Sequence, residues 1–155
     1  AAKSGTRRRN FQGYTEDGCE TLIGLGPSSV SRFRQGHAQN IPATGEYQRR
    51  VAAGTLATGR GVALTDDDHL RGWVIERLMC DFSFSAAEAL ARFGTAAQAV
   101  LAQAALLARP GADAELIRDG DRFVVPEARR PLVRLVAARF DRYLAVGTAR
   151  HSAAV

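Results

Sequence analysis

The chain has 155 residues, of which 46% are hydrophobic, so it is long enough and apolar enough to form a core. No apolar run approaches the roughly 18 residues that cross a membrane, and the first residues lack a signal-peptide core, so we expect a cytoplasmic protein with no membrane contact. The only cysteines, Cys19 and Cys80, lie far apart and form no Cys-x-x-Cys motif, which predicts reduced thiols and no metal site.

The formal net charge of +5 is unevenly distributed along the chain. Residues 1–60 contain nine basic and four acidic residues, whereas residues 61–155 contain twelve of each. A local positive field favours an anionic partner, such as a polycarboxylate, a phosphate or a nucleic acid. Because a nucleic-acid footprint is basic where it binds, the neutral back half argues against nucleic acid as a partner there.

The front of the chain shows little regular periodicity. Residues 1–20 contain three glycines and no hydrophobic period, so we expect an irregular segment. Residues 21–31 are typical of one short buried strand that leads into a turn. An exposed apolar strand edge favours pairing with another chain, so a dimer through residues 1–40 stays open.

Residues after 43 have the pattern of capped amphipathic helices. Thr65 precedes three aspartates that suit the positive end of a helix dipole, and Ser85 with Glu88 forms a capping box. Residues 58–61 are typical of a connector. The predicted helices cover residues 44–54, with Thr44 as N-cap and Gly54 as stop, residues 66–80, a segment from 85 onward, and residues 95–109.

The end of the chain predicts a hairpin followed by one more helix. Two apolar runs flank Asp119-Gly120-Asp121, the sequence of a tight β-turn. A last helix is expected after Pro131, running to about Val146 with Val133, Val136, Phe140 and Leu144 on one face. The fold class predicted for residues 61–155 is therefore mainly α with a small β-hairpin, in the order typical of a winged helix.

Several blocks of this sequence are specific strings. They are Arg9-Asn10-Phe11-Gln12-Gly13-Tyr14-Thr15, residues 22–31 (LIGLGPSSVS), residues 38–40 (AQN), residues 60–65 (RGVALT) with Asp67-Asp68, residues 77–82 (RLMCDF) and residues 139–144 (RFDRYL). In this order they resemble oxygen-independent coproporphyrinogen III oxidases, a family of radical S-adenosylmethionine enzymes. The resemblance covers residues 9–145, nearly the whole chain.

The resemblance implies a domain division and an activity. Residues 1–60 would be the irregular end of an α/β barrel region with its connector, and residues 61–155 the helical C-terminal domain. The full-length enzyme would use S-adenosylmethionine and a 4Fe-4S cluster to convert the tetrapyrrole coproporphyrinogen III to protoporphyrinogen IX in haem biosynthesis. The family's Cys-x-x-x-Cys-x-x-Cys cluster loop is absent here, so we expect a C-terminal piece that binds no cofactor and is inactive alone.

The resemblance also implies site residues. Phe11 and Gln12 would be catalytic residues near the reacting groups, and Val30 would contact a second S-adenosylmethionine. Arg9, at the end of an arginine run, would bind substrate, because guanidinium groups pair well with carboxylates. On residue type alone, Phe11 could be core, Gln12 could satisfy a turn, Val30 could be strand packing and the arginines could be a solvated cluster.

Two other functions stay open at this stage. A nucleic-acid-binding winged helix would explain the pI of about 10.0 and the helix–hairpin–helix ending. A haem-binding relative without oxidase activity would share the fold and most of the blocks.

Overall fold

The computed structural model describes residues 7–10, 13–111 and 114–144, and the chain forms two compact units. The helical unit comprises Ala1–Glu16 and Asp67–Val155, and the sheet unit comprises Asp17–Asp66. These units do not follow the expected division at residue 60, because the first 16 residues group with the helices. The origin of residues 1–60 in a barrel region stays a prediction.

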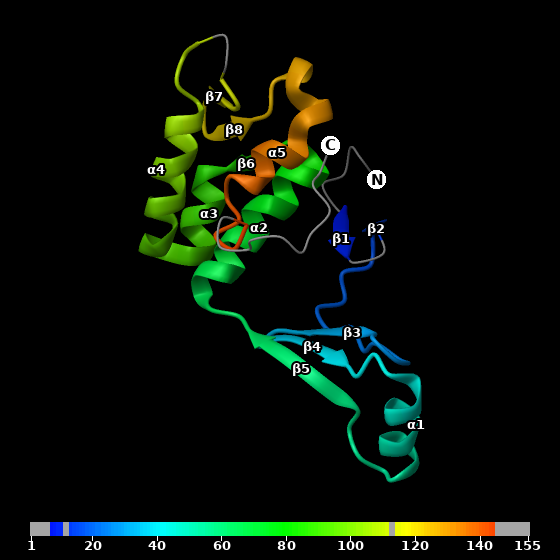
Figure 1. Ribbon diagram of the computed structural model, residues 1–155. Helices are drawn as coiled ribbons and strands as arrows, with labels where there is room; N and C mark the ends of the chain where they lie inside the picture. The colour runs from blue at the N-terminus through cyan, green and yellow to red at the C-terminus, as the bar shows by residue number, and fades with distance from the viewer. Residues whose placement is uncertain (1–6, 11–12, 112–113, 145–155) are drawn as a thin grey trace. The chain divides into compact units, whose positions relative to one another are not determined.

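The longest helices of the described part of the helical unit are α2, α3 and α4 (Figure 1). Ser85 caps α3 as its capping box predicts, since its Oγ accepts a hydrogen bond from the Glu88 N–H at 3.0 Å. Gly94, with φ +57°, ends α3, and a short 3-10 turn leads into α4. The bounds are α2 Asp66–Asp81, α3 Ala86–Phe93, η1 Gly94–Ala96 and α4 Ala97–Leu107.

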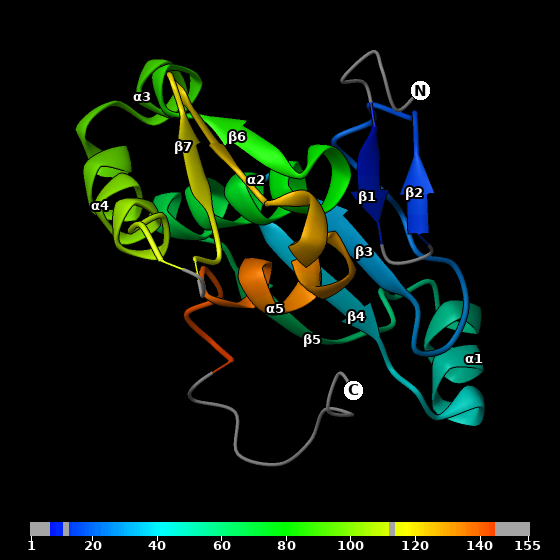
Figure 2. The same ribbon diagram turned by 90° about the horizontal axis from the view of Figure 1, so that it is seen from above.

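A small antiparallel sheet completes this part of the unit, with strand order β6-β8-β7 (Figure 2). The predicted hairpin is confirmed as β7 (Ile117–Asp119) and β8 (Arg122–Val124), with Gly120 at φ +54° in the turn. The third strand, β6 (Ser83–Ser85), joins the sheet directly after α2 and is absent from the sequence prediction.

The predicted final helix is wrong in length. A 3-10 segment, η2 (Glu127–Leu132), contains Pro131 and leads into a short α5 (Val133–Ala138). The next two turns close through i→i+3 hydrogen bonds rather than helical ones, and Val146 lies outside the described residues. Val133, Val136 and Phe140 of the predicted face are buried, whereas Leu144 is exposed, because the chain has left the helix before it reaches that residue.

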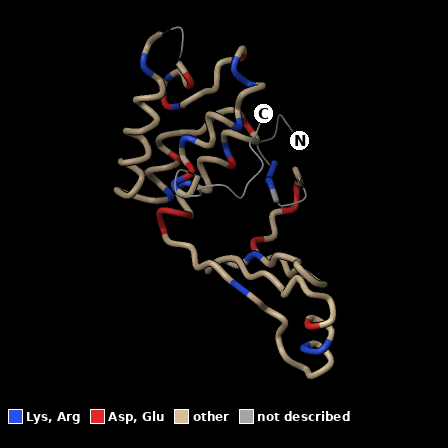
Figure 3. The backbone as a smooth tube through the Cα atoms, viewed as in Figure 1, with Lys and Arg blue, Asp and Glu red and all other residues tan. Residues whose placement is uncertain are grey.

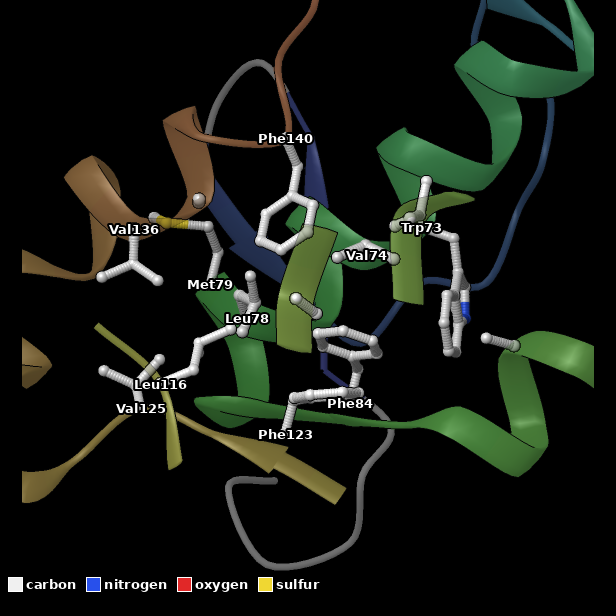
Figure 4. Close-up of a cluster of buried hydrophobic side chains, with 14 of the residues drawn as sticks. Trp73, Val74, Leu78, Met79, Phe84, Leu116, Phe123, Val125, Val136 and Phe140 are labelled. Atoms are coloured by element: carbon white, nitrogen blue, oxygen red, sulfur yellow. The ribbon is translucent and has the colours of Figure 1, made fainter. Parts of the chain in front are cut away.

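Aromatic side chains form the centre of the helical unit's core (Figure 4). The Phe84 ring stacks on Phe123 with centroids 5.2 Å apart, and its other contacts are edge-on, with Phe140 at 6.1 Å and Trp73 at 6.2 Å. The amphipathic helix predicted over residues 66–80 is confirmed as α2. Of its predicted apolar face, Leu70, Trp73, Val74 and Leu78 are buried, while Ile75 packs at the margin.

Strands β1 (Arg8–Asn10) and β2 (Gly13–Thr15) form a hairpin, so the expectation of an irregular segment over residues 1–20 is wrong for this part of it. The two strands pair antiparallel, with Asn10 opposite Gly13. Local periodicity missed them because three-residue strands are too short to show alternation.

The sheet unit is a three-stranded antiparallel sheet with one helix. Residues 21–31 are not one strand, because β3 begins only at Val30, and residues 58–61 belong to strand β5 rather than to a connector. Helix α1 starts at Thr44, but Ala43 is its N-cap and no side chain caps it; Gly54, at φ +68°, follows its end. The bounds are β3 Val30–Phe33, β4 Gly36–Asn40, α1 Thr44–Ala52 and β5 Thr58–Ala63.

The stretch Ala86–Leu107 is long and apolar enough to cross a membrane by length and composition, which corrects the expectation that no run is. In the structure it consists of α3 and α4 with the 3-10 turn between them. Several of its small side chains lie in the core of the helical unit, namely Ala89, Ala97, Val100 and Ala104.

Candidate functional site

Two segments carry the predicted site residues, one in each unit. The signature hairpin, residues 8–15, belongs to the helical unit, and the glycine loop, residues 24–29, belongs to the sheet unit and precedes Val30. Phe11 and Gln12 lie outside the described residues, between the two strands of the signature hairpin. Their predicted catalytic role stays a prediction, and the strands on either side of them are held by α2 as follows.

Glu76 of α2 holds the first strand of the signature hairpin. Its carboxylate accepts a hydrogen bond from the Arg9 backbone N–H at 3.2 Å and pairs with Arg8 Nη1 at 3.3 Å. The Glu76 side chain is 21% exposed and the Arg8 side chain 45%. The contact to the backbone is the more restrictive of the two, because it fixes the strand rather than a flexible side chain.

Arg77, the next residue of α2, reaches the same strand from a more buried position. Its Nη2 donates to the Arg7 carbonyl at 2.9 Å, while its Nη1 donates to Asp81 Oδ2 at 2.7 Å. The Arg77 side chain is only 12% exposed. The rigid guanidinium fork thus links the start of the hairpin to a carboxylate one turn further along its own helix.

The second strand also contacts α2. The Tyr14 hydroxyl donates to the Met79 carbonyl at 3.3 Å, and the Arg7 guanidinium lies 5.7 Å from the centre of the Tyr14 ring. Both strands of the signature hairpin are therefore tied to one helix that lies more than 60 residues later in the chain.

Arg9 occupies the middle of β1, opposite Tyr14, and is exposed. Figure 3 shows the basic residues of β1 in blue. An exposed guanidinium next to Phe11 and Gln12 is suited to bind a carboxylate of a ligand. That role for Arg9 stays a prediction.

Polar side chains of its own unit shape the glycine loop. The Asn40 amide donates to the carbonyls of Gly24 at 3.1 Å and Gly26 at 3.0 Å. The backbone N–H groups of the same two glycines bond other side chains: that of Gly24 donates to Ser31 Oγ at 3.0 Å, and that of Gly26 donates to the Tyr47 hydroxyl at 3.1 Å. These four bonds satisfy loop backbone groups that no regular strand would satisfy.

Two backbone features make the loop dependent on its sequence. A Cβ atom at Gly24 would lie 2.8 Å from the Val30 carbonyl oxygen, so no larger residue fits without a shift. Gly26 and Ser28 have φ values of +97° and +60°, a region that suits glycine and costs other residues energy.

Val30 is the first residue of β3, where the glycine loop ends. It pairs with Gln39 of β4 and is half-buried. The Gln39 amide donates to the Ser28 carbonyl at 2.8 Å and its oxygen accepts from Arg60 Nε at 2.6 Å. The position is compatible with strand packing and with a partly exposed apolar contact, and the predicted cofactor contact stays a prediction.

The sequence prediction missed the residues that support both segments. Asn40 and Arg77 lie in blocks of the resemblance, but nothing in those blocks states what they contact. Glu76 carries no local signal, since a charged residue on an amphipathic helix is ordinarily solvated.

The cysteines do not form a cluster site. An iron–sulfur cluster needs several thiolates, whereas this chain has two cysteines, Cys19, which is exposed in the sheet unit, and Cys80, which is buried in the helical unit. Across residues 7–10, 13–111 and 114–144, no three His, Cys, Asp or Glu side chains gather as metal ligands. The residues of this chain therefore do not fit the cluster that the family uses.

The pKa of each thiol is raised above its ordinary value. Burial raises the pKa of the Cys80 thiol, and the nearby Glu76 charge adds to the effect. The Asp17 carboxylate, whose own pKa is lowered by the Cys19 backbone N–H at 2.9 Å, raises the pKa of the Cys19 thiol. Neither cysteine has the lowered pKa of a reactive nucleophile.

Curated proteins and one solved structure resemble this chain closely. An oxygen-independent coproporphyrinogen III oxidase of Bradyrhizobium diazoefficiens is 45% identical over 150 residues, covering 97% of this chain and 33% of the relative. One of the same name from Cereibacter sphaeroides is 46% identical over 141 residues, covering 90% of this chain and 31% of the relative. No protein-family model matches the chain.

The fold agrees with the sequence comparison. The solved structure of an Escherichia coli coproporphyrinogen III oxidase, described as a radical SAM enzyme, matches with a TM-score of 0.80 and 33% identity. The match covers 92% of this chain and 33% of that one. This chain thus spans about a third of the length of the proteins it resembles, and the matched part is their C-terminal third.

Proposed function

Because the chain belongs to the oxygen-independent coproporphyrinogen III oxidase family, we propose that it forms the C-terminal part of such an enzyme, which converts coproporphyrinogen III to protoporphyrinogen IX in haem biosynthesis. The observation that carries the proposal is the similarity along nearly the whole chain, in sequence and in fold together. It includes both the signature hairpin and the glycine loop, so it is not confined to the packing core.

The proposed reaction is the oxidative decarboxylation of propionate side chains by a radical SAM enzyme. S-adenosylmethionine and a 4Fe-4S cluster are the cofactors proposed for the complete enzyme. Since the two cysteines here do not fit the cluster, its ligands would come from outside this chain. This chain would contribute groups that bind and orient the substrate, and alone it would be inactive.

The residue roles follow from the two segments. Arg9 would pair with a propionate carboxylate of the substrate, supported by its exposure on β1. Phe11 and Gln12 would act beside it, and Val30 would offer an apolar contact to an S-adenosylmethionine. The glycine loop supports the role of Val30, because its hydrogen bonds to Asn40 hold the approach to β3 in one conformation.

The helical unit resembles a winged helix in its order of elements. The order α2-β6-α3-α4-β7-β8, with the sheet order β6-β8-β7, supports that finer description. A nucleic-acid role is not supported, because α4 occupies the place of a recognition helix and its sequence, AQAVLAQAALL, contains no Lys or Arg. We therefore propose a winged-helix-like scaffold that serves the enzyme.

The cellular location and the dimer remain proposals as well. A cytoplasmic location fits a biosynthetic enzyme of this family. Dimerisation through residues 1–40 is supported by two exposed apolar side chains, Ile23 at 60% and Leu25 at 83% exposure. Sedimentation of the chain and of an Ile23→Ser, Leu25→Ser variant tests the dimer, and equal masses for the two would count against it.

A hybrid enzyme tests the proposed function. The first two-thirds of the Bradyrhizobium oxidase would be joined to this chain in place of its own last third. We expect anaerobic formation of protoporphyrinogen IX by the hybrid and none by the truncated oxidase or by this chain alone. A folded hybrid with its cluster loaded but without turnover would contradict the proposal. Haem binding by that inactive hybrid would favour the haem-binding relative instead.

Within the active hybrid, single changes assign the site residues. Gln12→Ala is expected to lower turnover sharply while iron content and circular dichroism stay unchanged, because misplaced reacting groups cost rate rather than stability. Val30→Asp places a charge on an apolar contact and is expected to weaken S-adenosylmethionine binding. Near-normal turnover by Gln12→Ala would remove that residue from the active site.

A further inference from the structure

Helix α2 contacts the signature hairpin through Glu76, Arg77 and the Met79 carbonyl. We propose that Glu76 and Arg77 are positioning residues, which hold β1 and β2, the strands on either side of Phe11 and Gln12 in the sequence, in one position against α2. The proposal rests on the proposed function, since it concerns the same site. Neither residue would touch substrate or cofactor.

The geometry of the contacts supports a positioning role. Glu76 accepts from the Arg9 N–H at 3.2 Å, and Arg77 donates to the Arg7 carbonyl at 2.9 Å. Both bonds go to backbone atoms, one of Arg7 just before β1 and one of Arg9 within it, so they fix the path of the chain at the start of the hairpin. Tyr14, on the other strand, reaches the Met79 carbonyl at 3.3 Å and fixes the exit.

The hairpin depends on such contacts because it is very small. Strands of three residues each are marginal without partners, and a two-stranded hairpin is barely stable alone in water. Its side chains add little apolar burial, since Tyr14 is 55% exposed and Arg8 and Arg9 are exposed as well. None of the described hairpin residues belongs to the core of the helical unit.

The contacts of Glu76 and Arg77 with the hairpin backbone are called the clamp, and Arg77 is its more buried member. Arg77 pairs with Asp81 at 2.7 Å within α2 and its side chain is 12% exposed, which restricts the orientation of its guanidinium. The neighbouring residues Leu78 and Met79 are buried core. The hairpin is thus held by a helix that also supplies Leu70, Trp73 and Val74 to the buried core.

Amide hydrogen exchange on the full chain tests the clamp without any activity. Glu76→Ala is expected to speed exchange of the hairpin amides, Arg9 above all, by about tenfold or more, because local opening then needs no rupture of the clamp. Core amides of α2 should be unchanged. Glu127→Ala is the matched control, since it removes a surface ion pair, Glu127 with Arg130 at 2.8 Å, that is remote from the hairpin.

Kinetics of the hybrid enzyme test the consequence. Glu76→Ala is expected to lower kcat by about 10- to 100-fold with little change in KM, since a displaced reacting group costs rate in the bound state. Glu76→Gln keeps an acceptor oxygen for the Arg9 N–H and should recover most of that loss. Arg77→Lys replaces the two nitrogens that bond Asp81 and the Arg7 carbonyl separately by a single one, and it should behave like Glu76→Ala in both measurements.

Two results would overturn the proposal. One is hairpin exchange in Glu76→Ala that equals that of the unaltered chain and of Glu127→Ala. The other is unchanged kcat in an active hybrid despite faster exchange, which would make the clamp purely structural. If the unaltered hybrid itself is inactive, the proposed function fails, and the exchange comparison alone then decides whether the clamp exists.

Discussion

Asp121, in the turn of the β7–β8 hairpin, caps the same helix end as Ser85. Its carboxylate accepts from the Ala87 N–H at 2.9 Å and from the Ser85 hydroxyl, and its carbonyl accepts from the Ala86 N–H at 2.9 Å. Ser85 Oγ in turn accepts from the Glu88 N–H at 3.0 Å. Three consecutive N–H groups at the start of α3 are therefore satisfied, and the hairpin is tied to the helix by the same atoms.

Ser85→Ala is expected to lower the free energy of unfolding by about 1 kcal/mol, the usual cost of losing an N-cap side chain. Urea unfolding followed by circular dichroism measures it. Thr95→Ala is the control, because Thr95 is exposed and caps no helix end. Equal stability of the two variants would mean that water replaces the Ser85 bond at no cost.

Stability is expected to depend on pH through Asp121. The Ser85 hydroxyl first, and then the Ala87 N–H, lower the pKa of the Asp121 carboxyl below its ordinary value of 3.8. A lowered pKa in the folded state stabilises the protein above the ordinary value, and this contribution is lost as the pH falls through the folded-state value. The stability difference between the unaltered chain and Asp121→Asn should therefore shrink below about pH 4. A difference that stays constant as the pH falls to about 2.5 would contradict the assignment.

Gly72→Ala and Gly120→Ala are expected to change stability in opposite directions. Gly72 lies within α2, and no neighbouring atom lies within 4 Å of the position that an alanine Cβ would take. Alanine should therefore raise the free energy of unfolding by about 0.5–1 kcal/mol through its higher helix propensity. Gly120 also has open space, but its φ of +54° should make alanine cost about 1–2 kcal/mol. Thermal unfolding of the two variants gives the signs, and a loss at Gly72 would show that α2 needs that glycine for another reason.

Phe84→Ala is expected to destabilise the helical unit by about 3–5 kcal/mol, the usual cost of emptying a large aromatic site in a core. Phe84 is 1% exposed and contacts three other aromatic rings. Leu106→Ala, at a side chain 56% exposed, is the control and should cost less than about 1 kcal/mol. Chemical unfolding compares them, and similar costs would show that the core can collapse around the lost ring.

Gly36→Ala is expected to disrupt the sheet unit alone. A Cβ there would lie 2.1 Å from the Val62 carbonyl oxygen, and the φ of +155° is one that alanine rarely adopts. Amide exchange of β4 and β5 should rise strongly, while the amides of α2 keep their protection. Gly18→Ala, at an open position of the same unit, should leave both units unchanged. Equal effects in both units would contradict the division of the chain at residues 16/17 and 66/67.

The parts of the fold that follow from local rules could be predicted from the sequence. The apolar period of α2, the Ser85 capping box and the Asp-Gly turn before Asp121 each depend on residues close in the chain. The signature hairpin could not be predicted in this way. Its strands show no alternation, and the residues that hold it, Glu76 and Arg77, lie far along the sequence, where ordinary helix-surface charges would look the same.

The apolar period also did not predict where the final helix ends. The predicted helical face is correct for Val133, Val136 and Phe140, but beyond Ala138 the chain forms i→i+3 turns instead of continuing as an α-helix. The site residues could be placed in the chain only through the resemblance, because single side chains such as Gln12 or Val30 carry no signal of their own.

The grouping of residues 1–16 with residues 67–155 makes the sheet unit an insertion within the helical unit. During synthesis, β1 and β2 are therefore made some fifty residues before α2, the helix that they contact. Closing a loop of that length nevertheless costs little more free energy than closing a shorter one. A gene fragment cut to begin after the sheet unit would encode α2 without the hairpin that it holds. The helical unit can be isolated whole only by shortening the insertion and keeping both of its flanks.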